Sequence, residues 1–146
     1  MNWHSFSIGK PKLAFAQAGV EEYSARLRAF ATVRVEFVKP GARESESAAL
    51  LRRSEGMFRV VLDERGTEVT SREFAEKISA WEMRGVKNIA LLVGGADGHG
   101  DDLKKTADWT WSLGRLTLQH ELALVVLLEQ IYRAFTIKAG LPYHRE

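Results

Sequence analysis

The sequence predicts one α/β domain with a mostly parallel sheet. Short β-branched runs alternate with amphipathic helical segments, and residues 88–93 form an almost uninterrupted apolar run, typical of a strand buried on both faces. This run leads directly into a glycine-rich segment at residues 94–100. The length of 146 residues, with 45% hydrophobic and 27% charged residues, fits a globular chain. We therefore expect residues 1–146 to form one domain.

The first half of the chain predicts two strand and helix pairs. A partly alternating apolar stretch over residues 3–9 predicts a strand, and apolar residues spaced by three and four over residues 13–30 predict a helix. Alternation over residues 33–37 predicts a second strand, closed by a Pro-Gly pair. The charged segment 43–53 predicts a weaker helix.

The middle of the chain continues the alternation. Residues 58–62 form a short β-branched strand, and residues 63–66 have the composition of a turn that ends it. Thr70 and Glu73 have the spacing of a capping box, which predicts a helix start, and Gly85 predicts its end. The buried strand 88–93 then follows.

The last third predicts a short helix, a strand with a loop, and a long helix. A charged helix is expected from residue 101 to about residue 109, and residues 111–118 are too interrupted by glycine for a helix. Residues 121–138 form the longest helical segment, which Gly140 ends. Because this helix is apolar on more than one face, we expect it to pack against the domain and against a further surface.

Composition excludes several classes of protein. The chain has no cysteine, which excludes disulfide frameworks, thiolate metal sites and cysteine nucleophiles. Its 21 basic and 19 acidic residues give a formal charge of +2, too balanced to indicate nucleic-acid binding by net charge. No apolar run approaches the roughly 20 residues of a membrane span, and the first residues do not resemble a signal peptide. We expect a cytoplasmic protein.

Candidate binding residues lie where parallel strands end. Ligands bind outside the carboxyl ends of such strands, which here are Leu62 and residues 94–100. The glycine spacing matches neither a dinucleotide fingerprint nor a P-loop, so the segment is either a ligand loop or a plain turn. His99 with Asp101 and Asp102 could hold a cation, but the acidic pair favours helix capping. No histidine pair has a zinc spacing, and no metal site is expected.

The end of the chain combines three useful side chains. Tyr143 can stack on a base, His144 carries an imidazole that can exchange a proton, and Arg145 can bind phosphate through two hydrogen bonds. A frayed terminus is the alternative interpretation.

Several stretches match one family in order and spacing. They are Gly9-Lys10-Pro11-Lys12, Glu22-Tyr23, Arg26-Leu27, Leu62-Asp63, Gly66, Ser71 to Ala75, Gly94-Gly95-Ala96-Asp97-Gly98, Trp111-Ser112-Leu113, Leu116-Thr117-Leu118 with His120, Glu129-Gln130, Tyr132-Arg133-Ala134 and Pro142-Tyr143-His144-Arg145. The chain thereby resembles, over essentially its whole length, the RlmH-type methyltransferases of the SPOUT superfamily. These enzymes use S-adenosylmethionine (SAM) to methylate N3 of a pseudouridine in large-subunit ribosomal RNA.

The resemblance implies a C-terminal trefoil knot, a homodimer and a substrate within assembled ribosomes. It implies that SAM is bound by residues from three segments: Leu62, Gly95, and Gly114, Arg115, Leu116, Thr117, Leu118 and Gln119. It also implies that Tyr143, His144 and Arg145 serve the target site, reaching the partner subunit's cofactor, and that Arg133 binds RNA or orders a loop.

Three residues depart from the family pattern. Gln119 replaces a common proline, Glu121 follows His120, and Leu124 replaces a common arginine. The missing proline is expected to loosen the cofactor loop. Two alternatives stay open: a non-enzymatic ribosome-associated RNA-binding protein on the same fold, and a flavodoxin-like nucleotide enzyme that uses the glycine loop.

Overall fold

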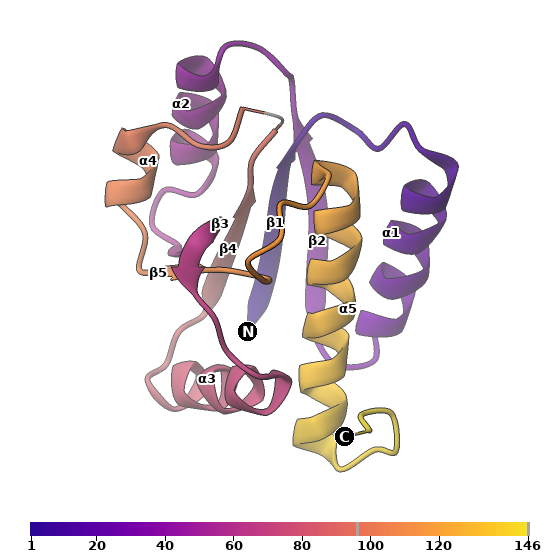
Figure 1. Ribbon diagram of the computed structural model, residues 1–146. Helices are drawn as coiled ribbons and strands as arrows, with labels where there is room; N and C mark the ends of the chain where they lie inside the picture. Colours follow the sequence, from indigo (N-terminus) through magenta and orange to yellow (C-terminus); the bar gives the residue numbers. More distant parts are fainter. Residues whose placement is uncertain (96, 146) are drawn as a thin grey trace.

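The computed structural model describes residues 1–95 and 97–145. Ala96 of the glycine-rich segment and Glu146 of the tail lie outside the described residues. Five strands, all parallel, form one sheet in the order β2-β1-β4-β3-β5. Helices cover both faces of the sheet (Figure 1), which confirms the predicted α/β class.

The elements alternate along the chain, as the sequence pattern predicts. The strands are β1 (Asn2–Ile8), β2 (Thr32–Val38), β3 (Phe58–Thr67), β4 (Asn88–Val93) and β5 (Trp109–Trp111), and the helices are α1 (Ala14–Leu27), α2 (Arg43–Arg53), α3 (Ser71–Met83), α4 (Asp101–Lys105) and α5 (His120–Ala139). Among the described residues, no helix is both long and apolar enough to cross a membrane.

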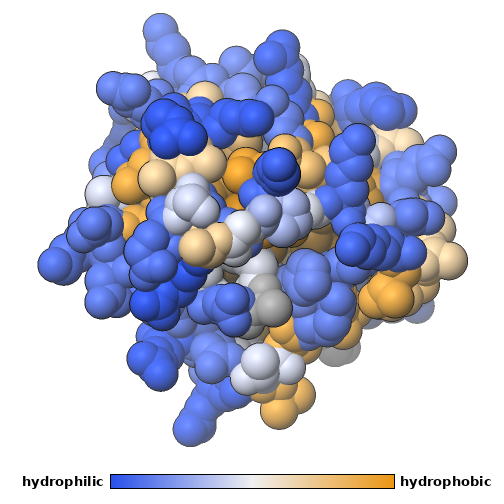
Figure 2. Space-filling model, turned by 90° about the horizontal axis from the view of Figure 1, so that it is seen from above, coloured by the Kyte–Doolittle hydropathy of each residue, from blue (hydrophilic) through white to orange (hydrophobic). Residues whose placement is uncertain are grey.

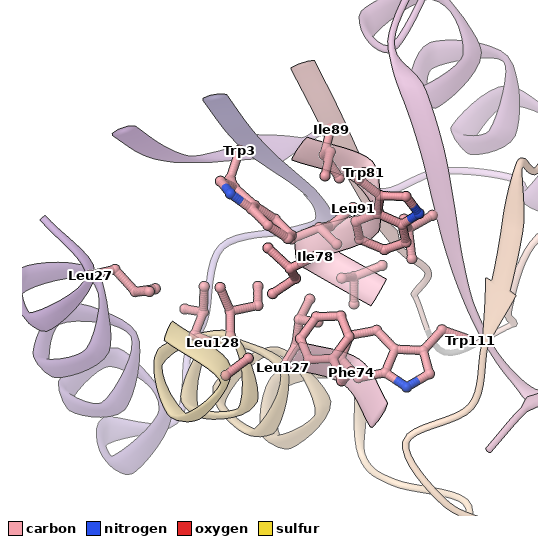
Figure 3. Packing of buried hydrophobic residues seen from close by; sticks show 14 of the residues in the cluster. Trp3, Leu27, Phe74, Ile78, Trp81, Ile89, Leu91, Trp111, Leu127 and Leu128 are labelled. Atoms are coloured by element: carbon pink, nitrogen blue, oxygen red, sulfur yellow. The ribbon is translucent and has the colours of Figure 1, made fainter. Parts of the chain in front are cut away.

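Two apolar cores lie on the two faces of the sheet. Successive strand residues point to opposite faces, so Val60 and Leu91 join the core beneath α1, α3 and α5, while Val61 and Leu92 join the core beneath α2 and α4. Figure 3 shows the larger core, in which Trp111 stacks on Phe74 with ring centres 4.2 Å apart. Strand β4 is buried on both faces, as predicted.

The strand order excludes the flavodoxin-like alternative. In this sheet β4 lies between β1 and β3, whereas flavodoxin-like sheets place β3 beside β1. Because all strands are parallel, the loops after β1, β2, β3 and β4 meet at one edge of the sheet. The start of α5 lies at that edge too (Figure 1).

Strand β3 is longer than predicted. The expected turn at residues 63–66 is present as a bulge, because Leu62 and Thr67 both pair with Trp111. Within it, Arg65 N–H donates to the Asp63 carboxylate (2.9 Å). Gly66 lies so close to β5 that a Cβ there would be 2.7 Å from the Thr110 carbonyl oxygen. The prediction that these residues end the strand is therefore wrong, because β3 continues through the bulge to Thr67.

The predicted helix from residue 101 to residue 109 is wrong in its second half. Helix α4 ends at Lys105, and Trp109 begins an edge strand. The segment before β5 pairs with β3 instead of continuing the helix. Asp108 N–H donates to Arg59 O (2.9 Å), and Asp108 Oδ2 accepts from Arg59 N–H (2.8 Å). Tertiary pairing here outweighs local helical preference.

Helix ends follow the sequence signals in most places. The Thr70 and Glu73 capping box is present at α3, and Gly85 and Gly140 have positive φ values just past α3 and α5. The expected capping of α4 by Asp101 and Asp102 is wrong. Gly100 is the N-cap, and the acidic pair occupies the first turn. There the two carboxylates interact favourably with the positive end of the helix dipole.

Candidate active site

A cleft opens at the edge where β3 and β4 end. Its volume is about 750 Å³, within the range of about 300–1,000 Å³ usual for small-molecule sites. Its walls come from residues 62–65 in the bulged part of β3, from residues 93–95 and 97–99 at and after the end of β4, and from residues 113, 114 and 116–119 between β5 and α5. Figure 2 looks onto this end of the molecule, where hydrophilic side chains predominate and less polar residues lie between them.

The glycine-rich segment presents backbone to the cleft. A Cβ on Gly94 would lie 3.2 Å from the carbonyl carbon of Gly98, and one on Gly95 would lie 3.2 Å from Ile8 Cγ2. Gly98 N–H donates to Gly95 O (3.1 Å), and Gly98 has a φ of +72°, a conformation that favours glycine. This wall is therefore a tight turn with little room for side chains.

His99 closes this turn from inside the protein. Its side chain is buried, and its Nε2–H donates to the carbonyl oxygen of Leu92 (3.0 Å). Its Nδ1 has no hydrogen-bond partner among the described residues. Burial lowers the pKa of His99, so the ring is neutral at pH 7. No group of three or more His, Asp or Glu side chains in the described ranges is placed to hold a metal ion.

The loop between β5 and α5 forms the opposite wall. Ser112 N–H donates to Thr67 O (2.9 Å), and Ser112 Oγ donates to Gly114 O (2.8 Å). Thr117 Oγ1 donates to the Glu64 carboxylate (2.6 Å). The bonds to Thr67 and Glu64 attach the loop to the last residues of β3.

Most of the predicted cofactor residues meet in this cleft. The lining includes Leu62, Gly95, Gly114, Leu116, Thr117, Leu118 and Gln119. Arg115 is exposed and does not line the cleft. Residues from three separate segments are thus brought together as the family resemblance implies.

Charged residues of the predicted turn, and Lys104 of α4, also line the cleft. Lys104 Nζ lies 3.3 Å from Asp63 Oδ2. Burial raises the pKa of Asp63, but the Arg65 N–H bond and Lys104 together outweigh it and hold the pKa below its ordinary value. Asp63 and Glu64 directly follow the strand predicted over residues 58–62, at its carboxyl end, and this position was the signal that could have identified them.

The two polar departures from the family pattern stabilise the loop region. The Gln119 side chain accepts hydrogen bonds from the N–H groups of Glu121 and Leu122 (2.9 and 3.0 Å), so it caps α5. The buried Glu121 Oε1 accepts from the N–H groups of Lys12 and Leu13 (2.8 and 2.9 Å). The expectation that losing proline loosens this region therefore needs correction, because polar bonds hold it.

We expect Glu121→Ala to lower the melting temperature by roughly 3–8 °C at pH 7, because two N–H groups lose their acceptor. The Leu13 N–H bond is the main cause of the lowered pKa of Glu121. The advantage of the wild type over the alanine variant should persist above the ordinary carboxyl pKa and shrink as the pH falls through the lowered one. Calorimetric scans at several pH values measure this. Glu121→Gln, which keeps an acceptor oxygen, is the control and should stay close to wild type.

The tail packs against α5. Tyr143 Oη donates to Glu129 Oε1 (3.0 Å), which also accepts from Arg133 Nη2 (2.7 Å). Arg133 Nη1 donates to His144 Nδ1 (3.0 Å), and the Tyr132 ring lies edge-on to Tyr143. The frayed-terminus alternative is therefore wrong for Tyr143 and His144.

The tail lies far from the cleft of its own chain. Helix α5 starts at the cleft with His120 and runs for 20 residues, a length of about 30 Å. Figure 1 shows the C-terminus and the glycine loop at opposite ends of the molecule. Tyr143, His144 and Arg145 can therefore meet a cofactor in such a cleft only across a subunit boundary.

Comparison with known proteins defines the class. A family model described as "Predicted SPOUT methyltransferase" matches residues 1–144. The chain belongs to this methyltransferase family, as its motifs indicated.

Relatives match over almost their full length. "Ribosomal RNA large subunit methyltransferase H" of Thermus thermophilus is 48% identical over 139 residues, covering 95% of both chains. The protein of the same name from Deinococcus radiodurans is 43% identical over 145 residues, covering 99% of both. These relatives confirm the resemblance stated from the sequence.

Solved structures share the fold at low identity. A probable methylase family protein from Haemophilus influenzae matches with a TM-score of 0.60 and 12% identity, covering 99% of this chain and 70% of the other. A Legionella pneumophila protein solved with bound SAM matches with a TM-score of 0.52 and 12% identity, covering 92% of this chain and 66% of the other. Both likenesses extend over nearly all of the sheet and helices.

Proposed function

We propose that this protein transfers a methyl group from SAM to N3 of a pseudouridine in large-subunit ribosomal RNA. The observation that carries the proposal is the meeting of Gly95, Gly114 and residues 116–119 in one cleft, in a chain whose full-length relatives are named as large-subunit rRNA methyltransferases. The proposal includes the C-terminal trefoil knot, a cytoplasmic location and assembled ribosomes as substrate.

The cleft suits SAM in size and chemistry. Its glycine wall offers backbone groups, and Leu62, Leu116 and Leu118 offer apolar surface, the combination that a purine ring needs. Asp63 and Lys104 add charged groups that suit an amino acid moiety. When bound, SAM supplies an electrophilic methyl group, so the protein needs neither a metal nor a covalent nucleophile to activate it.

The acceptor nitrogen must lose its proton before or during the transfer. A base within about 2.6–3.2 Å of that proton can take it. Burial raises the pKa of Tyr143, so its phenol stays protonated and suits stacking and hydrogen bonding. We assign His144 to proton removal and Arg145 to the RNA phosphate or the developing negative charge.

We infer a homodimer, and the distance between the tail and its own cleft supports this inference. Exposed apolar side chains gather where α1 and α5 begin, beside the cleft: Leu13, Phe15 and Leu122 are 42%, 53% and 36% exposed. The two helices pack closely, since a Cβ on Gly19 would lie 2.8 Å from Val125 Cγ1. This face suits the partner subunit.

We expect sedimentation at micromolar concentration to report twice the 16.4 kDa chain mass. Phe15→Glu with Leu122→Glu should give a monomer that still melts cooperatively, because both changes put charge on an exposed apolar face. Met83→Glu, at a side chain that is 90% exposed elsewhere, is the matched control and should remain dimeric. A catalytically active wild-type monomer would contradict the homodimer.

The deciding experiment compares ribosomal RNA from cells with and without this protein by mass spectrometry. We expect one methyl group on a pseudouridine to disappear, and purified protein with SAM to restore it on isolated ribosomes. Calorimetry with SAM separates this function from the non-enzymatic alternative, since an RNA-binding protein without the chemistry should bind no SAM.

A further inference from the structure

We propose that the loops after β1 and β2, together with the first residue of α2, form a basic flank of the cleft, composed of Lys10, Lys12, Lys39 and Arg43, which binds the phosphate backbone of the RNA beside the methylated nucleotide. This inference rests on the proposed function and assigns the part of the surface that holds the substrate strand. The four side chains are exposed. Arg43 also lines the cleft, and it is the one member of the flank that forms an ion pair, with Glu44 (3.2 Å), among the described residues.

The two loops lie side by side. Gly9 N–H donates to Val38 O (2.7 Å), and a Cβ on Gly9 would lie 3.2 Å from Pro40 Cγ. Because β1 and β2 are adjacent parallel strands, Lys10 and Lys39 follow them at neighbouring positions of the same edge. Cations that are distant in sequence are thereby collected on one surface.

Buried carboxylates anchor both loops by their backbones. Glu121 binds the N–H groups of Lys12 and Leu13, and Glu46 Oε2 accepts from Gly41 N–H (3.0 Å). Both glutamates are only 7% exposed. Since these carboxylates bind main chain, the lysine side chains are left to solvent on a pre-organised backbone, which lowers the entropy cost of binding.

The flank adjoins the glycine wall of the cleft. Gly95 packs against Ile8 at the end of β1, and Ser47 Oγ of α2 accepts from Gly100 N–H (2.8 Å). A nucleotide whose base reaches the cleft would therefore have its backbone over the β1 and β2 loops.

Negative charge on the other side of the cleft disfavours an RNA backbone there. There the lining from the bulge of β3 and from the segment after β4 contains four acidic residues, Asp63, Glu64, Asp97 and Asp101, and two basic ones, Arg65 and Lys104. Lys104 is already paired with Asp63. No ion pair is formed by Lys10, Lys12 or Lys39 within residues 1–95 and 97–145, so phosphates can bind them without displacing a carboxylate. Phosphate contacts of this kind supply affinity and position the strand.

The test compares two double variants of equal charge. Lys10→Glu with Lys39→Glu alters the flank, and Arg52→Glu with Lys87→Glu alters exposed cations in the last turn of α2 and just before β4, away from the cleft. Each substitution changes the charge by two, so both variants carry a formal charge of −2 instead of +2. Substrates are ribosomes purified from cells that lack this protein.

We expect the flank variant to raise KM for ribosomes roughly tenfold and to reduce the slope of log affinity against log salt by about 1.5, because two phosphate contacts are lost. Its SAM affinity and kcat should match those of the control variant, which should keep the wild-type KM and salt slope. Equal KM and equal salt slope for the two variants would overturn the inference. Raised KM with an unchanged salt slope would also overturn it, since a protein surface and not phosphate would then be the partner.

Failure of the proposed function has a different signature. If the wild type methylates no ribosomal RNA, filter binding of ribosomes to the same variants still measures the flank through its salt slope. A smaller slope of log affinity against log salt in the flank variant, but not in the control variant, would then show that the flank binds phosphate although the protein transfers no methyl group.

Discussion

Removing the chain after Leu141 is expected to abolish methyl transfer to ribosomes while SAM affinity stays within about threefold of the full-length value. The reason is the separation seen in the structure, with the cleft at the start of α5 and Tyr143, His144 and Arg145 beyond its end. Single-turnover transfer at saturating ribosomes, with calorimetry for SAM, measures the two effects separately.

The double variant His144→Ala with Arg145→Ala is the milder form of the same test. It keeps Tyr143 and its bond to Glu129, so α5 should remain intact, as a melting curve can check. Full turnover by either variant would show that the tail has no part in the chemistry. Loss of SAM binding together with turnover would instead place the tail in the cofactor site.

Gly95→Trp is expected to weaken SAM binding by at least about a hundredfold, because its Cβ already meets Ile8 at 3.2 Å and the remaining indole must enter the cleft or displace the glycine turn. Calorimetry measures the affinity, and the melting temperature shows whether the fold persists. Met83→Trp adds the same side chain at an exposed site and should bind SAM normally. A folded Gly95→Trp protein with wild-type affinity would refute the placement of the cofactor.

Mixing the two inactive proteins tests whether the tail acts across subunits. A heterodimer of the truncated chain and the Gly95→Trp chain has one complete site, formed by the intact cleft of the first and the intact tail of the second. Random exchange makes half of the dimers mixed, so about a quarter of wild-type activity should return. No recovery from confirmed heterodimers would show that each site uses its own tail.

Much of the fold could be predicted from local patterns. The capping box at Thr70 and the glycines past α3 and α5 act within one helical turn, so their residues suffice to define the helix ends. The buried strand β4 was recognisable from its composition alone. The errors at Asp63 to Thr67 and at Trp109 arose where pairing with a distant strand decides the conformation.

The candidate site was only partly accessible from the sequence. The carboxyl-end rule located Leu62 and the glycine turn, and the resemblance added residues 114–119. The roles of Asp63 and Glu64 in the lining were missed because both looked like turn residues. The support that Glu121 gives to Lys12 was also missed, because the two residues are 109 positions apart.

The α/β class, the family and most helix boundaries can be predicted from the chain alone, because periodicity, caps and motifs depend on residues close together in it. The strand order, the continuation of β3 through its bulge and the separation of the tail from its own cleft depend instead on tertiary contacts. The anchoring of the basic loops by two buried carboxylates depends on them too. These features depend on contacts between distant segments, whose free energies become available only when the two cores form around the sheet.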